Sequence, residues 1–246
     1  MMLACPSLLL RRAPFNLPLR TLSPYQMPNM LAWFDAGTPE SVLNSVAPDV
    51  PATDGQTVRR WLDLSGNNYH LNQATGAYQP VLEVTGLNGR RAIRNPGSNT
   101  CAMESVSFAP AFPFTAYHVG QVVSWSDSGR FVTLGLGARQ VCRQRNSNNL
   151  QTNFGLELTN TAAVGLKTHA FAAVVTGAAT SRVVVGGQVV TGNTGSTAAD
   201  RIIVFSAAGA FTNGRLCELL LFAGEHPSST ISAVLAFLRS KWGTEL

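Results

Sequence analysis

Short apolar or alternating segments recur along most of the chain, and Gly, Asn, Ser or Thr separates most of them. Short segments bounded by turn residues are typical of the strands of a sandwich or barrel. The pattern therefore predicts an all-β fold built as an antiparallel sandwich of two sheets. The predicted strands cover residues 31–35, 57–63, 80–84, 92–94, 114–123, 130–136, 154–158, 169–175, 182–185, 188–190, 201–205 and 216–222.

One segment near the end of the chain has a clear helical period instead. Its apolar residues stand at i, i+3, i+4 and i+7, which places them on one helix face. Ser228 or Ser229 is the expected N-cap, because a hydroxyl can accept a bond from a free N–H of the first turn. We expect this helix to end near residues 242–243 and to lie on the sandwich. The apolar residues are Ile231, Val234, Leu235 and Leu238.

Residues 1–29 contain five prolines and precede the strand pattern. Proline fixes φ and lacks an N–H donor, so this segment is expected to be neither helix nor central strand. We interpret residues 1–29 as an extended arm and residues 30–246 as one sandwich domain with its terminal helix. The leucines of the arm argue against a free tail, so it should lie along the domain or on a neighbouring subunit. Its candidate partner-binding residues are Arg11, Arg12, Phe15 and Arg20. Residues 38–54 are expected to be a loop, and residues 191–199 an ordinary hairpin loop.

Composition narrows the classes of partner. Charged residues make up 13% of the 246 residues, about half the usual ~25%. A surface covered by uncharged polar residues suits contacts with sugars or neighbouring subunits. The net charge of +5 comes without a basic stripe interleaved with aromatics, so no nucleic-acid partner is expected. No stretch reaches the ~20 apolar residues of a membrane span, so no membrane partner is expected either.

The N-terminal segment and the cysteines indicate in which compartment the protein is expected. The apolar run at residues 8–10 is followed, not preceded, by arginines, which is the wrong order for a secretory signal. We therefore expect the chain to stay in the cytoplasm of its maker or to leave it by a route that needs no peptide signal, such as release in a particle dispersed by lysis. The four cysteines form no C-x-x-C motif and do not indicate a zinc site. Their disulfide state stays open, with reduced, buried thiols preferred.

Three groups of motifs resemble concanavalin-like, laminin-G-type domains of phage and bacterial proteins. The first comprises LAWFDA at 31–36, VRRWLDLSGNNYHL at 58–71, QP at 79–80 and LNGRRAIR at 87–94. The second comprises HAFAAVV at 169–175 and RVVVGGQVV at 182–190, where Gly186 replaces the usual Asn. The third comprises GRLCELLLF at 214–222 and FLRSKWG at 237–243. The resemblance covers roughly residues 30–243 and implies a jelly-roll sandwich. Members of the family bind carbohydrate, pack as virion or tail components, or act as spacers.

Three aromatic residues are the candidate carbohydrate-binding residues. Tyr69 and Tyr78 lie in or beside polar turns, and Trp125 lies in a loop-like Ser-Trp-Ser-Asp segment. Rings at such positions can stack on sugar faces, although large aromatics more often fill the core. Residues 139–149 form a basic, polar segment that we interpret as a solvated hairpin tip. Contact with a partner or an anionic glycan is the alternative.

Catalysis and metal binding have weaker signals. No Asp or Glu pair stands at i, i+2 or i, i+4 in a predicted strand, as the paired carboxylates of a glycosidase would on one strand, so no enzyme is expected. A glycan-cleaving enzyme with a carboxylate pair drawn from different strands is the alternative. Glu218 stands alone and should pair with a backbone donor or an arginine. The alternation of Asp63, Ser65 and Asn67 resembles the start of a calcium loop, but a local turn explains it better. No cofactor or metal site is expected, with one structural Ca²⁺ as the alternative.

The leading hypothesis is a non-enzymatic bacteriophage virion protein, assembled in the host cytoplasm and placed in the capsid decoration or in the tail or fibre. It would contact other virion proteins through the arm, form homo-oligomers, and adhere to a host surface glycan. The alternative is a stand-alone carbohydrate-binding adhesin outside any virion. The sequence leaves capsid against tail position, copy number and the identity of a glycan open.

Overall fold

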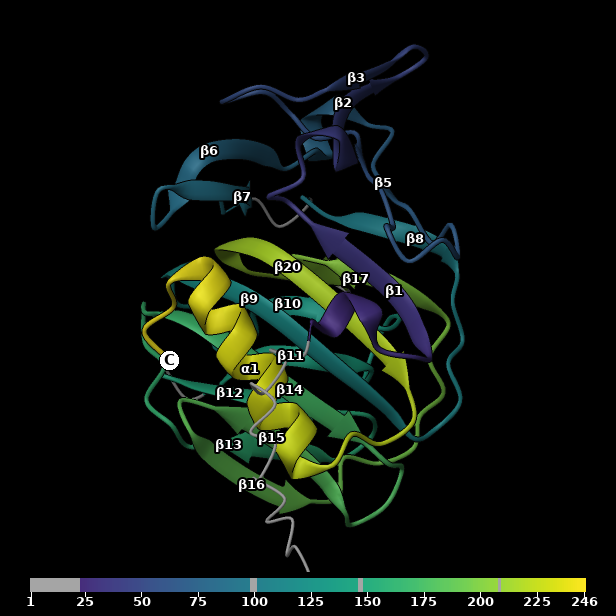
Figure 1. The fold of residues 1–246 in the computed structure, drawn as a ribbon, viewed down its shortest axis with the longest axis vertical. Coiled ribbons are helices and arrows are strands. Elements are labelled where there is room, and N and C mark those ends of the chain that lie inside the picture. The colour runs from purple at the N-terminus through teal and green to yellow at the C-terminus, as the bar shows by residue number, and fades with distance from the viewer. Residues whose placement is uncertain (1–22, 98–100, 146–147, 208) are drawn as a thin grey trace, which may run out of the picture.

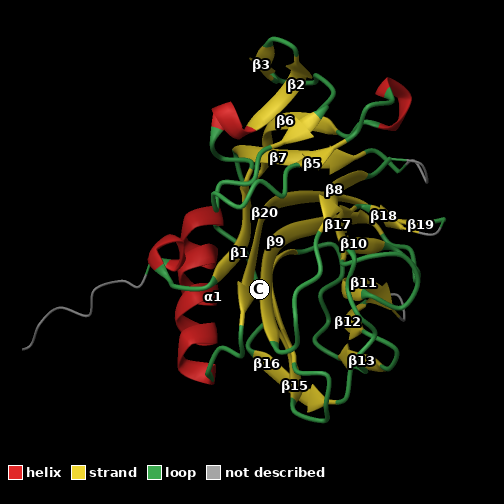
Figure 2. Cartoon of the chain, turned by 90° about the vertical axis from the view of Figure 1, so that its right-hand side faces the viewer, coloured by secondary structure: helices red, strands yellow, loops and turns green. Residues whose placement is uncertain are grey.

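The fold comes from a computed structural model, which describes residues 23–97, 101–145, 148–207 and 209–246. Two antiparallel sheets pack face to face, and helix α1 (Ser228–Trp242) lies across the outer face of one of them (Figures 1 and 2). This confirms the predicted two-sheet sandwich with one C-terminal helix. None of the helices among the described residues is long and apolar enough to cross a membrane.

We call the sheet beneath the helix sheet A. Its strand order is β16-β15-β14-β9-β20-β7-β6, with β1 also pairing with β20. The strands are β1 (Met30–Asp35), β6 (Val81–Leu87), β7 (Arg90–Asn95), β9 (Phe114–Ser124), β14 (Thr168–Val175), β15 (Ser181–Val185), β16 (Gln188–Gly192) and β20 (Asn213–Ala223).

Sheet B is the facing sheet, in the order β13-β12-β11-β10-β17-β8-β5-β4-β2-β3. Its strands are β2 (Val42–Val46), β3 (Asp49–Pro51), β4 (Arg60–Trp61), β5 (Leu71–Asn72), β8 (Met103–Ser107), β10 (Arg130–Thr133), β11 (Gln140–Arg145), β12 (Asn149–Asn153), β13 (Glu157–Asn160) and β17 (Arg201–Val204). Smaller elements are the hairpin β18 (Ser206–Ala207) and β19 (Ala210–Phe211), and the 3₁₀ turns η1 (Pro24–Gln26), η2 (Pro39–Ser41) and η3 (Gly76–Tyr78).

Two apolar layers hold the molecule together. The larger lies between the sheets and includes the fully buried Phe34, Trp61 and Phe171. The second lies between sheet A and α1, where Tyr117 and Phe222 pack against the helix. Since sheet A is covered on both faces, all eight residues of β14 are buried, which explains its nearly continuous apolar sequence.

The helix confirms the predicted apolar face and C-terminus. Gly243 ends it in the left-handed region at φ 64°, where its N–H bonds to Arg239 O. The predicted serine N-cap is wrong. Pro227 occupies that position without a side-chain bond, and Ser228 Oγ instead accepts a bond of 2.9 Å from Arg182 Nη1.

Several predicted loops and strands differ from the structure. Residues 38–54 are not a loop, because they contain η2, β2 and β3. Residues 154–156 form a turn between β12 and β13, not a strand. Residues 193–200 connect β16 of sheet A to β17 of sheet B and are not a hairpin loop. β8, β11 and β12 were missed because polar residues break their apolar pattern.

The end of the predicted arm is folded onto the domain. Pro24–Gln26 forms one turn of 3₁₀ helix, contrary to the expectation of no helix, because proline is compatible with the first position of a helix. Tyr25 stacks on Trp33 with ring centroids 4.3 Å apart. The four candidate partner residues Arg11, Arg12, Phe15 and Arg20 lie outside the described residues, so the partner-binding role of the arm stays a prediction.

Candidate functional site

The outer face of sheet B is polar, and no helix among the described residues packs across it (Figure 2). Successive residues of a strand point to opposite faces, and Trp61, Leu71 and Val204 belong to the core between the sheets. Their neighbours therefore face outward. The strand register aligns these outward residues into one row across sheet B, which we call row one: Arg60, Asn72, Glu104, Ile203, Thr133, Gln140, Asn153 and Glu157.

A second row runs beside it over β10 to β13. Row two consists of Arg130, Arg143, Gln151 and Thr159, each opposite the next in register. Glu157 on β13 forms ion pairs with two arginines of β11, Arg143 at 3.2 Å and Arg145 at 3.6 Å.

These ion pairs pass over the intervening strand β12. Gln151 lies on that strand, so the ion pairs above it explain why it is fully buried. The basic segment at 139–149 is thus mostly strand, with its arginines laid along the sheet. The interpretation of the segment as a solvated hairpin tip is therefore wrong for residues 140–145, which form strand β11 and pair with β12.

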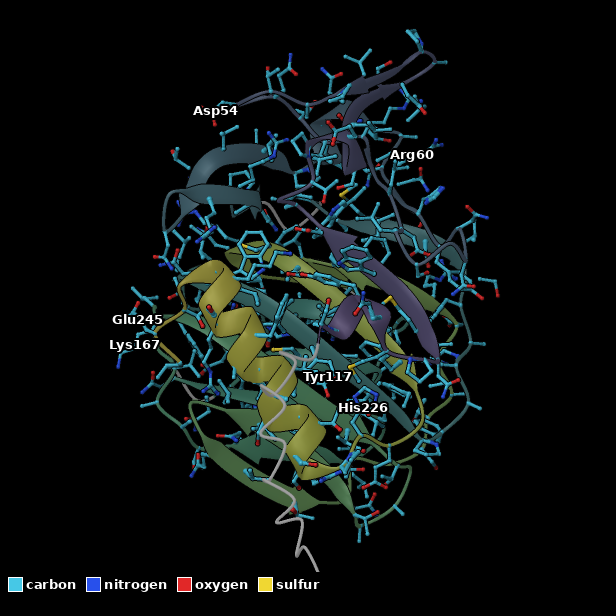
Figure 3. All side chains as sticks on the ribbon, in the orientation of Figure 1. Asp54, Arg60, Tyr117, Lys167, His226 and Glu245 are labelled. Carbon is cyan, nitrogen blue, oxygen red and sulfur yellow. The ribbon has the colours of Figure 1, made fainter. Side chains whose placement is uncertain are left out.

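A pocket of about 200 Å³ lies at the other end of sheet B, beside β4 and β5. Arg60, Asn72 and Gln73 supply its polar lining, together with Arg59 and two small apolar residues. Arg60 Nε donates to Asn72 Oδ1 at 2.7 Å, which orients both side chains. Among the described residues, no acidic side chain lines this pocket. Figure 3 shows Arg60 at the edge of the molecule, far from α1.

The three predicted sugar-stacking residues do not form one cluster. Tyr78, in η3, is 42% exposed and follows Gln73 of the pocket by five residues. Tyr69 packs edge-on against Phe108 at 4.8 Å, so its ring is partly in the core. Trp125 follows β9 of sheet A, and its Nε1 donates to Asp127 Oδ1 at 2.9 Å. Of these three aromatic residues, Tyr78 thus combines an exposed side chain with a position close in sequence to a residue of the pocket.

A larger cavity of about 320 Å³ lies at the end of α1. Its lining includes Asp35, Arg91 and Lys241. Arg91 Nε donates to Ala36 O at 3.0 Å, and Lys241 Nζ donates to Asp35 Oδ2 at 2.9 Å. Because these groups already have partners inside the protein, we interpret the cavity as part of the attachment of α1 to sheet A.

Glu218 is the centre of that attachment. Its carboxylate is fully buried and accepts bonds from Lys241 Nζ (2.8 Å), Tyr25 OH (2.9 Å), Trp33 Nε1 (3.1 Å) and Trp242 Nε1 (2.5 Å). The expected backbone or arginine partner is therefore wrong. Burial raises the pKa of Glu218, and the ammonium of Lys241 opposes that rise.

Three of the histidines lie in the packed interior and contact other side chains of the protein. The Nε2 atoms of His118 and His169 lie 3.2 Å apart, fully buried between the sheets. Burial lowers the pKa of both, to about 4 for His169. On the other face of sheet A, His226 Nδ1 lies 2.7 Å from Tyr117 OH (Figure 3).

The segment that resembles a calcium loop uses its carboxylate locally. Asp63 Oδ1 accepts bonds from the backbone N–H groups of Trp33 and Ser65, and its Oδ2 accepts one from Tyr69. The described residues contain no group of three or more His, Cys, Asp or Glu side chains placed to hold a metal ion. Cys101, Cys142 and Cys217 are free and buried.

Comparison with known proteins places the fold. No protein-family model matches the sequence, and a search of curated proteins found no match. Domain 4 of AbnA, a GH43 extracellular arabinanase from Geobacillus stearothermophilus solved with arabinotriose, aligns with a TM-score of 0.58 and 10% identity, covering 84% of this chain and 98% of that one.

Two other solved structures are similar. The binding domain of Paraclostridial Mosquitocidal Protein 1 aligns at TM-score 0.56 and 13% identity, over 85% of this chain and 52% of that one. Trypanosoma rangeli sialidase in complex with sialic acid aligns at 0.54 and 10%, over 87% of this chain; the chain spans a third (33%) of the sialidase. At these identities the likeness establishes a shared β-sandwich fold.

Proposed function

We propose that this chain is a glycan-binding module that holds a carbohydrate on the outer face of sheet B. The observation that carries the proposal is row one, in which amide, hydroxyl and guanidinium side chains cross a sheet face that no helix of the described part of the chain covers. Such groups donate and accept hydrogen bonds as sugar hydroxyls require. The pocket at Arg60, Asn72 and Gln73 offers a concave end to this surface.

The fold neighbours support the choice of ligand class. The arabinanase domain was solved with arabinotriose and the sialidase with sialic acid. Those ligands belong to those proteins. They show that proteins with this sandwich fold include binders of carbohydrate, which makes a sugar the first ligand class to test here.

The proposal is binding without hydrolysis. Glu104 and Glu157 are the acidic residues of row one and stand five strands apart, on β8 and β13. Neighbouring strands are ~4.8 Å apart, so the two lie about 24 Å apart, whereas glycosidase carboxylates are ~5–9.5 Å apart. Carboxylates in this row are thus badly placed for such chemistry.

A role in a virion, as capsid decoration or as a tail or fibre component, stays a prediction from the sequence resemblance, as do homo-oligomers and virion localisation. A glycan-binding face on sheet B is compatible with both the virion protein and the stand-alone adhesin.

Affinity electrophoresis and calorimetry against a panel of neutral and acidic polysaccharides test the proposal. We expect at least one polymer to bind, and the Arg60→Ala/Asn72→Ala variant to bind it at least tenfold more weakly. Ser240→Ala, on the exposed side of α1, is the matched control and should bind as the wild type does. Equal binding by wild type and double variant would place the site elsewhere, and no binding to any polymer would reject the function.

A further inference from the structure

The pocket beside β4 and β5 contains two arginines that form no ion pair within the described part of the chain. Arg59 is exposed, and its side chain makes no hydrogen bond to another described residue. Arg60 is partly exposed and donates to Asn72 through Nε, so its Nη1 and Nη2 have no partner among the same residues. Since a guanidinium is always protonated, these two side chains bring two positive charges to one pocket.

The acidic residues that the strand register places nearest to the pocket do not neutralise these arginines. Glu104 stands opposite Asn72 in register, but it forms an ion pair with Arg201 at 3.3 Å. Asp49 stands opposite Val46 in the hairpin of β2 and β3 and is exposed to solvent. Neither acid lines the pocket. No carboxylate of the described residues therefore balances the charge of the pocket.

The amide side chains of the pocket already have their oxygen atoms occupied. Asn72 Oδ1 accepts the bond from Arg60, and Gln73 Oε1 accepts one from the backbone N–H of Thr75 at 3.0 Å. Gln73 Nε2 donates to Ala102 O at 2.8 Å. The side chains of the pocket therefore offer a ligand mainly N–H donors. A sugar hydroxyl both donates and accepts hydrogen bonds, whereas a carboxylate or sulfate only accepts them, so an anion matches this lining better.

The pocket has a fixed base and room for a single sugar unit. The backbone N–H of Arg59 donates to Leu43 O, and its carbonyl accepts from the N–H of Gln73, both at 2.8 Å. The volume of about 200 Å³ is below the ~300–1,000 Å³ of pockets that hold drug-sized ligands. Val46 and Ala74 supply a small apolar lining against which the C–H groups of a sugar ring can pack.

We propose that this pocket is an anion subsite of the glycan-binding face, where Arg59 and Arg60 bind the carboxylate or sulfate of one acidic sugar unit. The planar fork of a guanidinium matches two oxygens of such a group. The proposal rests on the proposed function, because it names the class of glycan that sheet B holds. The rest of the polymer would lie along row one, since Asn72 belongs to both row one and the pocket.

The experiment compares polymers that share a backbone and differ in charge. Polygalacturonate is paired with its methyl ester, and sulfated galactan with unsulfated galactan. Calorimetry at low salt is expected to show the acidic member of at least one pair binding about tenfold more tightly than its neutral counterpart. Raised salt should shrink this preference, because salt screens charges that are exposed to solvent. The pair that shows the preference identifies carboxylate or sulfate as the bound group.

Two arginine variants locate the preference. Arg59→Gln is expected to reduce it from about tenfold to less than threefold. Because the Arg59 side chain makes no hydrogen bond within the described residues, the fold should persist, which circular dichroism checks. Arg90→Gln is the matched control, since Arg90 is also exposed and without an ion pair there but lies on β7 of sheet A. It removes the same charge from the molecule and should keep the full preference.

Competition separates a sugar site from a site for simple anions. The acidic monosaccharide of the preferred pair, galacturonate or galactose 6-sulfate, should displace the polymer at concentrations about tenfold lower than inorganic sulfate does at equal ionic strength. Equal displacement by both would overturn the acidic sugar as the ligand.

The remaining outcomes distinguish this inference from the proposed function. Equal binding of acidic and neutral polymers would overturn the anion subsite and leave glycan binding standing. A preference that survives in Arg59→Gln, or that is lost equally in Arg90→Gln, would overturn its location. Failure of every polymer to bind would overturn both.

Discussion

Glu218 and Lys241 form an ion pair beneath α1, and both partners depend on it. Glu218 has no solvent exposure, so its charge must be compensated within the protein. Lys241 also bonds to Asp35 and Tyr25. The pair thus joins β20, β1, η1 and α1 at one point.

Replacing Lys241 with Met should therefore destabilise the protein. Removing one partner of a buried ion pair typically costs ~3–5 kcal/mol. We expect about 3 kcal/mol, because the donors from Trp33, Trp242 and Tyr25 remain on Glu218. Chemical denaturation measures the change. Lys167→Met is the control, since Lys167 is exposed and should change stability little. Similar stabilities for the two variants would contradict a buried electrostatic role.

The pair His118 and His169 predicts acid sensitivity. Burial lowers the pKa of His169 from 6.5 to about 4 and that of His118 well below 6.5. Below pH ~6.5 the unfolded chain therefore binds more protons than the folded protein. The stability due to this pair should be constant above that pH and fall as the pH drops toward 4.

Urea unfolding at pH 7 and pH 5 measures this effect for the wild type and for His169→Gln. The wild type should lose more stability than the variant between these two pH values, because the variant has one buried imidazole fewer to protonate. Carboxylates titrate in both proteins, so the difference between them isolates the histidine. Identical losses would show that His169 is not the sensitive group.

At the level of elements, the end of α1 depends on one glycine. Gly243 has φ 64°, a conformation that costs a residue with a Cβ about 1–2 kcal/mol. Gly243→Ala should lower the free energy of unfolding by about 1 kcal/mol, measured by thermal or urea denaturation. Gly243→Asn should lose less, since asparagine tolerates this region better. A Cβ added at position 243 would make only ordinary van der Waals contact with Asn88, at 3.6 Å. A loss of stability well above 1 kcal/mol would therefore mean that the end of the helix has shifted.

The strands differ in how easily they can be predicted from the sequence. β14 and β20 are covered on both faces and have long apolar runs, so both were predicted. β11 has the sequence QVCRQR, in which outward-facing polar residues and a bulge interrupt the alternation, and it was missed. The strands absent from the prediction include β8, β11 and β12, which contribute Glu104, Gln140, Arg143, Gln151 and Asn153 to rows one and two. The candidate site thus lies where apolar periodicity is least informative.

At the level of the whole molecule, the two sheets have different outer faces. Sheet A places apolar residues outward and buries them under α1, whereas sheet B places arginines, amides and hydroxyls outward. Among the described residues, α1 packs on sheet A, and no helix packs across the polar outer face of sheet B (Figure 2). The proposed glycan-binding face is therefore on sheet B, and the ion pair of Glu218 is on the opposite side of the sandwich.

The sequence by itself determined the all-β class, the amphipathic helix and its C-terminal glycine, because periodicity and turn chemistry are local properties. It also pointed to Tyr78 as a polar-turn aromatic. Only the tertiary structure decided that Arg130, Arg143 and Gln151 form one row and that Glu218 meets Lys241. Strand register and the packing of α1 bring together residues that are distant in sequence, and no local pattern encodes those distances.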